Sequence, residues 1–159
     1  MTHRERVITA LNHKQPDRVP IDLGGSVVTG INSMAYQKLK KYLGFKETIS
    51  HVTNIILMLS QVEKELIDRW KVDVLPLDRH DAGFGVSLSG DWFAHPLPDG
   101  SPAWFPRGFS PKIRDDGTWE IYNSDRIVTD VLSPGSGSFV PAYHPLKDAS
   151  VSDLDNFNI

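Results

Sequence analysis

The stretch Val19-Pro-Ile-Asp-Leu-Gly-Gly25, together with Val72-Asp-Val-Leu-Pro-Leu77, decides the fold expected for this 159-residue chain. Each is a short apolar run with one acidic residue inside it, which is typical of a strand buried in a parallel sheet. Helical patterns precede the first run and lie between the two, and strands separated by helices favour a parallel sheet. The sequence therefore predicts an α/β fold whose first two strands are these runs.

Three helices are predicted around these strands. The first begins with a capping box formed by Thr2 and Glu5 and ends near residue 13. The second spans residues 32–43, from an asparagine or serine cap to a glycine stop. The third covers residues 51–70, where apolar side chains recur at helical spacing. On the second helix we expect an apolar face of Ala35, Leu39, Tyr42 and Leu43 and a solvated face of Lys38, Lys40 and Lys41.

From residue 82 onward the sequence changes to turns and short strands. Trp119-Glu-Ile-Tyr122 and Arg126-Ile-Val-Thr-Asp-Val131 predict a β-hairpin. Residues 1–81 thus hold the first helix and two strand and helix units, residues 82–145 an irregular β-rich insertion, and residues 146–159 the start of another helix. Two strands cannot close a parallel sheet, and a helix start buries little. We therefore expect the chain to be the N-terminal part of one larger domain.

The composition is that of an ordinary globular protein, with 40% hydrophobic and 23% charged residues. A net charge of −3 gives no electrostatic reason to expect nucleic acid as a partner. The longest apolar run, over residues 55–59, is too short to cross a membrane, and the first residues do not form a signal-peptide core. The chain has no cysteine, which excludes a disulfide scaffold and a thiolate zinc site within it. A cytoplasmic location is therefore expected.

Several stretches resemble the uroporphyrinogen decarboxylase superfamily, in particular its branch related to cobalamin-dependent methyltransferases. The longest is Arg4-Glu-Arg-Val-Ile-Thr-Ala-Leu-Asn-His-Lys-Gln-Pro-Asp-Arg-Val-Pro-Ile-Asp-Leu-Gly-Gly25. The others are Tyr36-Gln-Lys-Leu-Lys-Lys-Tyr-Leu-Gly44, Val72-Asp-Val-Leu75, Tyr143-His-Pro-Leu146 and Asp153-Leu-Asp-Asn-Phe157. The resemblance implies a (β/α)8 barrel, of which this chain would supply the N-terminal portion with a β-hairpin insertion.

The resemblance also implies a reaction. A methyl group would move from a methylated corrinoid (cobalamin), free or held by a corrinoid protein, to a thiol-type acceptor. The His/Cys zinc site that activates the thiol in that branch lies in its C-terminal half, so no metal site is expected in this chain. Decarboxylation of uroporphyrinogen, a step of porphyrin biosynthesis, is the alternative. The arginine-bearing signature of those decarboxylases is absent here, where Leu23-Gly-Gly-Ser-Val-Val-Thr-Gly30 stands. Arginines suit a substrate with many carboxylates, so their absence counts against decarboxylation.

The candidate site residues follow the two predicted strands, because barrel active sites form at the C-terminal ends of strands. Asp22 is expected to contact a substrate or to cap the following turn, and Gly24 and Gly25 to let backbone amides approach an anion or simply to form that turn. In Asp78-Arg79-His80-Asp81, Asp78 and His80 are the catalytic candidates, as acid, base or ligand. A solvated loop is the alternative for that segment.

A hypothesis from another functional class also remains open. The chain can be a stand-alone, non-catalytic binding or assembly module that folds as a homo-oligomer or with a partner chain. As part of an enzyme, these residues alone are expected to be inactive, since the chemistry of the branch needs groups from elsewhere in the barrel. The partners expected of the enzyme are a corrinoid protein or a small-molecule substrate.

Overall fold

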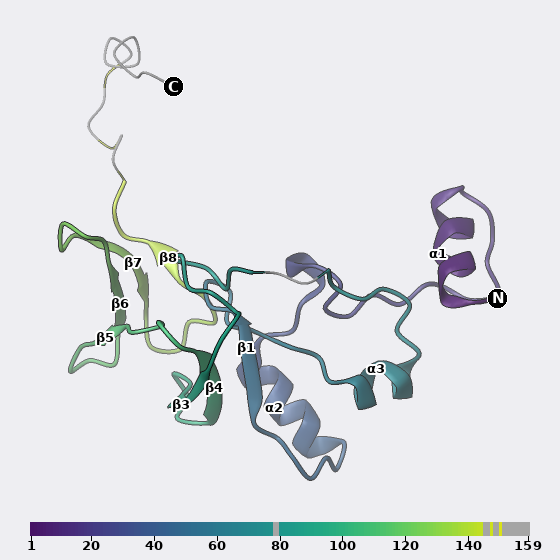
Figure 1. Ribbon diagram of the computed structural model, residues 1–159, viewed down its shortest axis with the longest axis horizontal. Helices are drawn as coiled ribbons and strands as arrows, with labels where there is room; N and C mark the ends of the chain where they lie inside the picture. Colours follow the sequence, from purple (N-terminus) through teal and green to yellow (C-terminus); the bar gives the residue numbers. More distant parts are fainter. Residues whose placement is uncertain (78–79, 145–146, 148–149, 151–159) are drawn as a thin grey trace.

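The computed structural model describes residues 1–77, 80–144, 147 and 150. Its helical elements are α1 (His3–Leu11), the 3-10 turn η1 (Val27–Thr29), α2 (Ser33–Tyr42) and α3 (Lys64–Trp70). Its strands are β1 (Ser50–Asn54), β2 (Leu59–Ser60), β3 (Trp92–Pro96), β4 (Pro102–Pro106), β5 (Lys112–Ile113), β6 (Trp119–Tyr122), β7 (Val128–Leu132) and β8 (Val140–Pro141). Figure 1 shows the strands gathered away from α1 and α3, with α2 beside β1.

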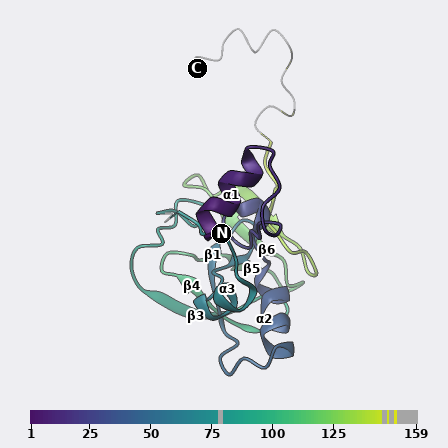
Figure 2. The ribbon, with the colours of Figure 1, turned by 90° about the vertical axis from the view of Figure 1, so that its right-hand side faces the viewer.

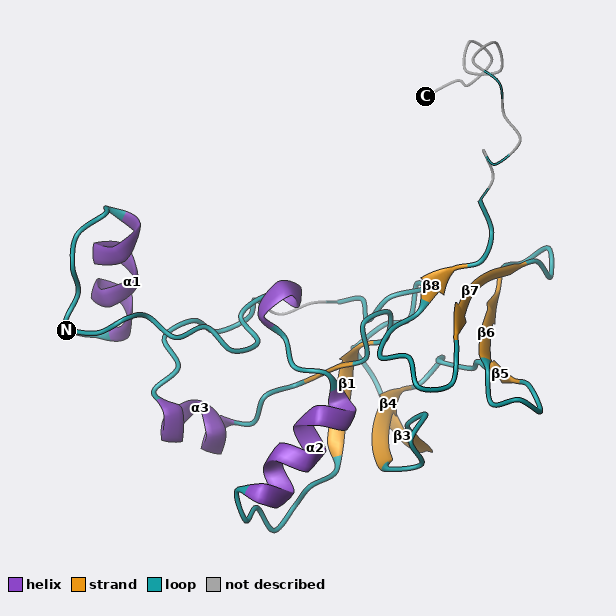
Figure 3. Ribbon diagram, turned by 180° about the vertical axis from the view of Figure 1, so that it is seen from behind, coloured by secondary structure: helices purple, strands orange, loops and turns teal. Residues whose placement is uncertain are grey.

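The strands form two four-stranded sheets. The first has the order β2-β1-β4-β3, with β1 and β4 parallel and the other pairs antiparallel. The second has the order β5-β6-β7-β8 and is antiparallel throughout. The hairpin predicted around residues 119–131 is confirmed as β6 and β7, which pair from Trp119 with Leu132 to Tyr122 with Val128. The described residues are therefore mixed α and β, and they form no closed barrel (Figure 3).

The two runs expected to be the first strands are not strands in the structure. They meet in one parallel bridge, between Asp22 and Val74. Two further bonds flank that bridge: the Asp73 amide donates to the Ile21 carbonyl, and the Ile21 amide donates to the Asp73 carboxylate. The predicted parallel pairing is thus present only as a bridge, because no third strand lies beside either run among the described residues.

The prediction of a third helix over residues 51–70 is wrong for its first half. Ser50–Asn54 is the central strand β1, paired with β4, and Leu59–Ser60 folds back on it as β2. Only Lys64–Trp70 is helical. The side chains of residues 50–60 bury themselves by joining a sheet whose other strands lie about fifty residues further along the chain, so local helical spacing was overridden by distant pairing.

The first two helices begin where their caps predict. Thr2 and Glu5 form the expected capping box at α1, and the Asn32 side chain accepts the Met34 amide at the start of α2. The buried face of α2 was predicted wrongly, however. Tyr42 is exposed and Lys40 is fully buried, and the buried residues of α2 are Ser33, Tyr36, Gln37 and Lys40. The polar side of α2 is turned inward because acceptors for its polar groups lie there.

The hydrophobic core belongs to the two sheets and the loops between them. Its buried members are Val52, Ile55, Met58, Ala82, Val86, Leu97, Ala103, Phe105, Phe109, Trp119, Leu132 and Phe139. Phe105 of β4 stacks on Phe109 with ring centroids 4.8 Å apart, and the His95 ring meets Trp119 of β6 edge-on at 5.1 Å. The insertion predicted over residues 82–145 therefore has its own order, and it holds most of the core.

Figure 1 shows α1 at one end of the molecule, away from the strands, and in the end-on view of Figure 2 α1 faces the viewer in front of them. None of the helices in the described part of the chain is long and apolar enough to cross a membrane. The helix start predicted over residues 146–159 lies almost entirely outside the described residues.

Candidate functional site

Asp22 lies at the end of the first run and organises the turn that follows. Its Oδ1 accepts the Gly25 amide at 2.9 Å and the Thr29 hydroxyl at 3.1 Å. The Gly24 amide donates to the Thr29 carbonyl at 2.9 Å, and Gly24 has a positive φ of 83°. Residues 22–29 thus form a closed loop that ends in η1. Asp22 is exposed, and among the described residues its Oδ2 accepts no hydrogen bond, so that oxygen is available to a ligand.

Gly25 is required by close packing inside the protein. A Cβ at this position would lie 2.5 Å from Asp22 Oδ1 and 2.6 Å from a Val74 methyl. The space above Gly25 is therefore filled by the chain's own side chains. The predicted role of Gly24 and Gly25 as a cradle for an anion has no geometric support beyond the turn itself, whereas the turn they were also expected to form is present.

The Asp78-Arg79-His80-Asp81 segment is only partly described. Asp78 lies outside the described residues. His80 is exposed and its carbonyl accepts the Leu88 amide at 2.8 Å. Asp81 turns into the loop after it, where its Oδ1 accepts the Gly83 amide at 2.6 Å. Within the described part of the chain, no hydrogen bond joins His80 to Asp22, so these two candidates are not assembled into one polar cluster.

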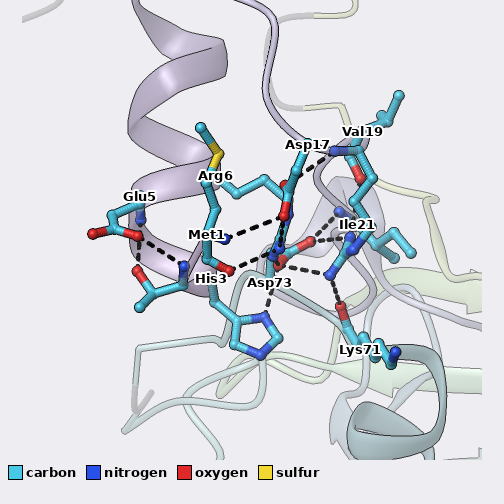
Figure 4. A network of polar contacts seen from close by, with 11 residues as sticks. Met1, His3, Glu5, Arg6, Asp17, Val19, Ile21, Lys71 and Asp73 are labelled. Carbon is cyan, nitrogen blue, oxygen red and sulfur yellow. Dashed lines mark hydrogen bonds and ion pairs between the residues drawn. The ribbon is translucent and has the colours of Figure 1, made fainter.

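The densest polar cluster lies one residue before the bridge, at Asp73 (Figure 4). Asp73 has a fully buried side chain. Its carboxylate accepts the Ile21 amide at 2.8 Å and the guanidinium groups of Arg6 and Arg18, each at 2.6 Å. The His3 Nδ1 lies 2.7 Å from the same carboxylate. Asp73, His3, Arg6, Arg18 and the Ile21 amide are called the Asp73 cluster below.

The charge of Asp73 is stabilised by these donors. Burial by itself would raise the pKa of Asp73, but the Ile21 amide and the Arg18, Arg6 and His3 side chains hold that pKa well below its ordinary value. In the sequence, Asp73 stands out only as the acidic interruption of a predicted buried strand. An acidic side chain in a buried strand needs a cationic partner, but the sequence does not show that its partners lie far upstream, at residues 3, 6 and 18.

A second buried cluster joins α2 to the start of α3. Lys40 Nζ donates to Glu63 Oε1 at 2.6 Å and to the Ile49 carbonyl at 2.9 Å. The Tyr36 hydroxyl donates to the other Glu63 oxygen and accepts the Glu63 amide at 3.1 Å. Burial first, and then the Glu63 carboxylate, raise the pKa of Tyr36 well above its ordinary value. Because each of these polar groups has a partner within the chain, the cluster is satisfied as a structural unit.

His51 of β1 lies beside two tryptophans. Its ring meets Trp92 edge-on at 5.1 Å and lies nearly parallel to Trp104 at 6.3 Å. Burial lowers the pKa of His51; Glu63 opposes this, Lys40 adds to it, and Glu47 has the smallest, raising effect. The three rings are partly buried, and His51 was not among the candidate site residues from the sequence.

The described residues contain no group of three or more His, Cys, Asp or Glu side chains able to hold a metal ion. A hollow of about 600 Å³ lies between the start of α1 and α3. Its lining combines apolar side chains, among them Val62 and Ile67, with polar ones, among them His3, Lys64 and Asp68.

No protein-family model matches the chain, and neither a curated protein nor a solved structure matches it.

Proposed function

We propose that this chain forms the opening part of a barrel enzyme similar to the uroporphyrinogen decarboxylase superfamily, in its corrinoid-linked methyltransferase branch. The observation that carries the proposal is the parallel bridge between Asp22 and Val74. The bridge joins the two runs that resemble the first and second strands of that barrel, and α1 precedes them in the expected order. Residues 82–141, which hold the second sheet and two strands of the first, would then belong to the insertion that follows the second strand.

The proposed reaction is transfer of a methyl group from a methylated corrinoid substrate to a thiolate acceptor. Zinc, held by residues of the parent barrel outside this chain, would lower the pKa of the thiol so that its sulfur can attack. The part assigned to this chain is substrate contact at the end of the first run. There, Asp22 holds the turn with Oδ1 and presents Oδ2, which can accept a hydrogen bond from an amide or hydroxyl group of the substrate.

The test begins with the coding DNA beyond the codon for Ile159. We expect the open reading frame to continue far enough to encode a complete barrel and to carry a His/Cys zinc pattern. Its product should demethylate methylcobalamin in the presence of a thiol, as followed by the change in the corrinoid absorption spectrum. Decarboxylation of uroporphyrinogen without methyl transfer would replace the proposal with its enzymatic alternative. A stop codon after Ile159, with a stable 159-residue protein, would favour a binding module.

Asp22→Asn provides the site-specific test in that product. Asparagine keeps Oδ1 as an acceptor for Gly25 and Thr29, so the turn should persist while the charge is lost. Loss of a hydrogen bond to a charged group costs about 1.5–3 kcal/mol, so kcat/KM for methylcobalamin should fall on the order of ten-fold or more. Asp130→Asn, on β7 in the second sheet, is the matched control and should leave kcat/KM unchanged. Equal activity of the two variants would reduce Asp22 to a turn residue.

A further inference from the structure

The helix α1 is attached to the rest of the protein by polar contacts. Arg6 is the only buried residue of α1. Of its larger apolar side chains, Ile8 is 44% and Leu11 74% exposed, and Val7 is only partly buried. Most helices in globular proteins are stabilised by burying an apolar face, and a helix of nine residues is marginal in water without such burial. The stability of α1 must therefore come from its few polar contacts.

Those contacts converge on one carboxylate. Arg6 donates to Asp73 at 2.6 Å and His3 contacts the same oxygen at 2.7 Å, and both residues belong to α1. Arg6 also donates to Asp17 at 2.6 and 2.8 Å, but Asp17 lies on the segment that immediately follows α1. Only Asp73 belongs to the later part of the chain, beyond α3. Asp73 thus joins the N-terminal segment to the body of the protein.

The core does not depend on this junction. Its buried side chains come from residues 52–139, and none of them belongs to the Asp73 cluster. Loss of the Asp73 carboxylate would leave Arg6 with Asp17 and the Met1 carbonyl, and Arg18 with only backbone carbonyl acceptors. The sheets would keep all their contacts. Segments with few buried apolar contacts open with a lower free energy than the core around which they fold.

We propose that α1 is an arm that detaches independently of the core, and that the Asp73 carboxylate is the latch that holds this arm in place. When the latch is open, α1 leaves the 72–74 segment and frays, because an isolated helix of this length does not hold its hydrogen bonds. The two sheets and α2 stay folded in that state. The arm is a conformational device of the fold that operates whatever reaction the parent protein performs.

Hydrogen exchange followed by mass spectrometry on the full 159-residue chain tests the proposal. The reporters are the amides of Arg6–Asn12, and the reference is the amides of α2 and of the β6–β7 pair. In Asp73→Asn, exchange at Arg6–Asn12 should become at least ten-fold faster, while exchange in the reference elements should change less than two-fold. Raising NaCl from 0.05 to 1 M in the unchanged chain should speed exchange at Arg6–Asn12 much less than Asp73→Asn does, because salt screens a buried ion pair far less than an exposed one.

Asp17→Asn is the matched control for the latch. It removes a carboxylate from the same arginine but leaves the link between α1 and Asp73 in place. Exchange in α1 should therefore rise much less in Asp17→Asn than in Asp73→Asn. Equal effects of the two variants would overturn the role of Asp73 as the latch. Simultaneous loss of protection in α1, α2 and β6–β7, in the variant or in high salt, would show that α1 opens only with the whole fold.

Discussion

Two lysines in this protein donate to a carboxylate oxygen at the same distance, 2.6 Å, in very different surroundings. Lys40 is fully buried against Glu63, whose side chain is 37% exposed. Lys64 pairs with Asp68 four residues later on α3, and their side chains are 85% and 60% exposed. An exposed pair gains little because water and salt screen it, whereas a buried cation that loses its partner keeps its full desolvation cost.

The two pairs should therefore respond differently to the loss of one charge. Glu63→Gln should lower the free energy of unfolding by about 3 kcal/mol, because it leaves the Lys40 ammonium buried without a counter-charge. Asp68→Asn should lower it by about 0.5 kcal/mol or less. Urea unfolding followed by tryptophan fluorescence measures both values. A similar small effect in both variants would mean that Lys40 can reach water when Glu63 is neutral.

Single residues were the hardest part of this protein to predict from its sequence. Lys40 stands beside Lys38 and Lys41, and a lysine cluster on a helix is usually solvated. Its acceptors, the Ile49 carbonyl and Glu63, come from segments that no local pattern places nearby. Asp22 was identified because it lies at the C-terminal end of a predicted strand, which is a local signal. Burial of a polar side chain depends on partners that are distant in sequence, so it becomes visible only in the fold.

At the scale of elements, the residue before α2, Asn32, holds the start of that helix. Its Oδ1 accepts the Met34 amide at 3.1 Å, and its Nδ2 donates to the Gly137 carbonyl at 2.7 Å and, at 3.3 Å, to the Leu57 carbonyl. One side chain therefore caps the helix and ties it to a loop 105 positions later in the chain. The sequence pattern predicted the cap, but it gave no indication of the tie.

Two substitutions separate the cap from the tie. Asn32→Ala removes both and should lower the free energy of unfolding by about 2 kcal/mol, from about 1 for the cap and about 1 for the hydrogen bond. Asn32→Ser keeps a capping oxygen but is too short to reach Gly137, so it should recover about half of that loss. Thermal unfolding followed by circular dichroism ranks the unchanged chain, Asn32→Ser and Asn32→Ala by stability. If the serine variant were as unstable as the alanine variant, the tie to Gly137 would account for the whole effect.

Elements with local signals were predicted, and elements with distant partners were not. The caps of α1 and α2 and the β6–β7 hairpin depend on residues close together in sequence, and all three are present. Residues 51–54 were included in a predicted helix whose apolar spacing comes from residues 59–70, yet β4, the partner of β1, begins at Pro102. The local spacing of side chains in one segment does not reveal a pairing partner that lies about fifty residues away.

At the scale of the whole molecule, the protonation of one histidine should be visible in the stability. The pKa of His51 is lowered mainly by burial beside Trp92 and Trp104. The unfolded chain, in which a histidine has its ordinary pKa of about 6.5, therefore binds more protons near and below that pH. The contribution of His51 to stability is then fully present above the ordinary pKa and is lost as the pH falls towards the lowered value.

The free energy of unfolding should accordingly decrease when the pH is lowered from 7.5 to 5, and part of that decrease should disappear in His51→Gln. Urea titrations at each pH, with the other five histidines unchanged in both proteins, isolate this contribution. An unchanged pH dependence in His51→Gln, or a steeper one, would contradict the lowered pKa of His51.

The fold class was predicted only coarsely. The mixture of helices and strands is present, but the parallel barrel strands expected at residues 19–23 and 72–77 meet in a single bridge. Most of the core instead comes from the insertion, whose composition indicated turns and short strands without showing how they pack. For the candidate site, the sequence located the Asp22 turn but missed the Asp73 cluster next to it.

The two ends of the 82–139 segment are held at the same place on the preceding part of the chain. The Ile55 amide donates to the Ala82 carbonyl at 2.7 Å, and the Ile56 carbonyl accepts the Phe139 amide at 2.8 Å. Two consecutive residues therefore hold both ends of the 82–139 segment. Exposed turns within this segment, such as Asp99-Gly100, should therefore tolerate changes of length, because they lie far along the chain from this junction and carry none of its hydrogen bonds.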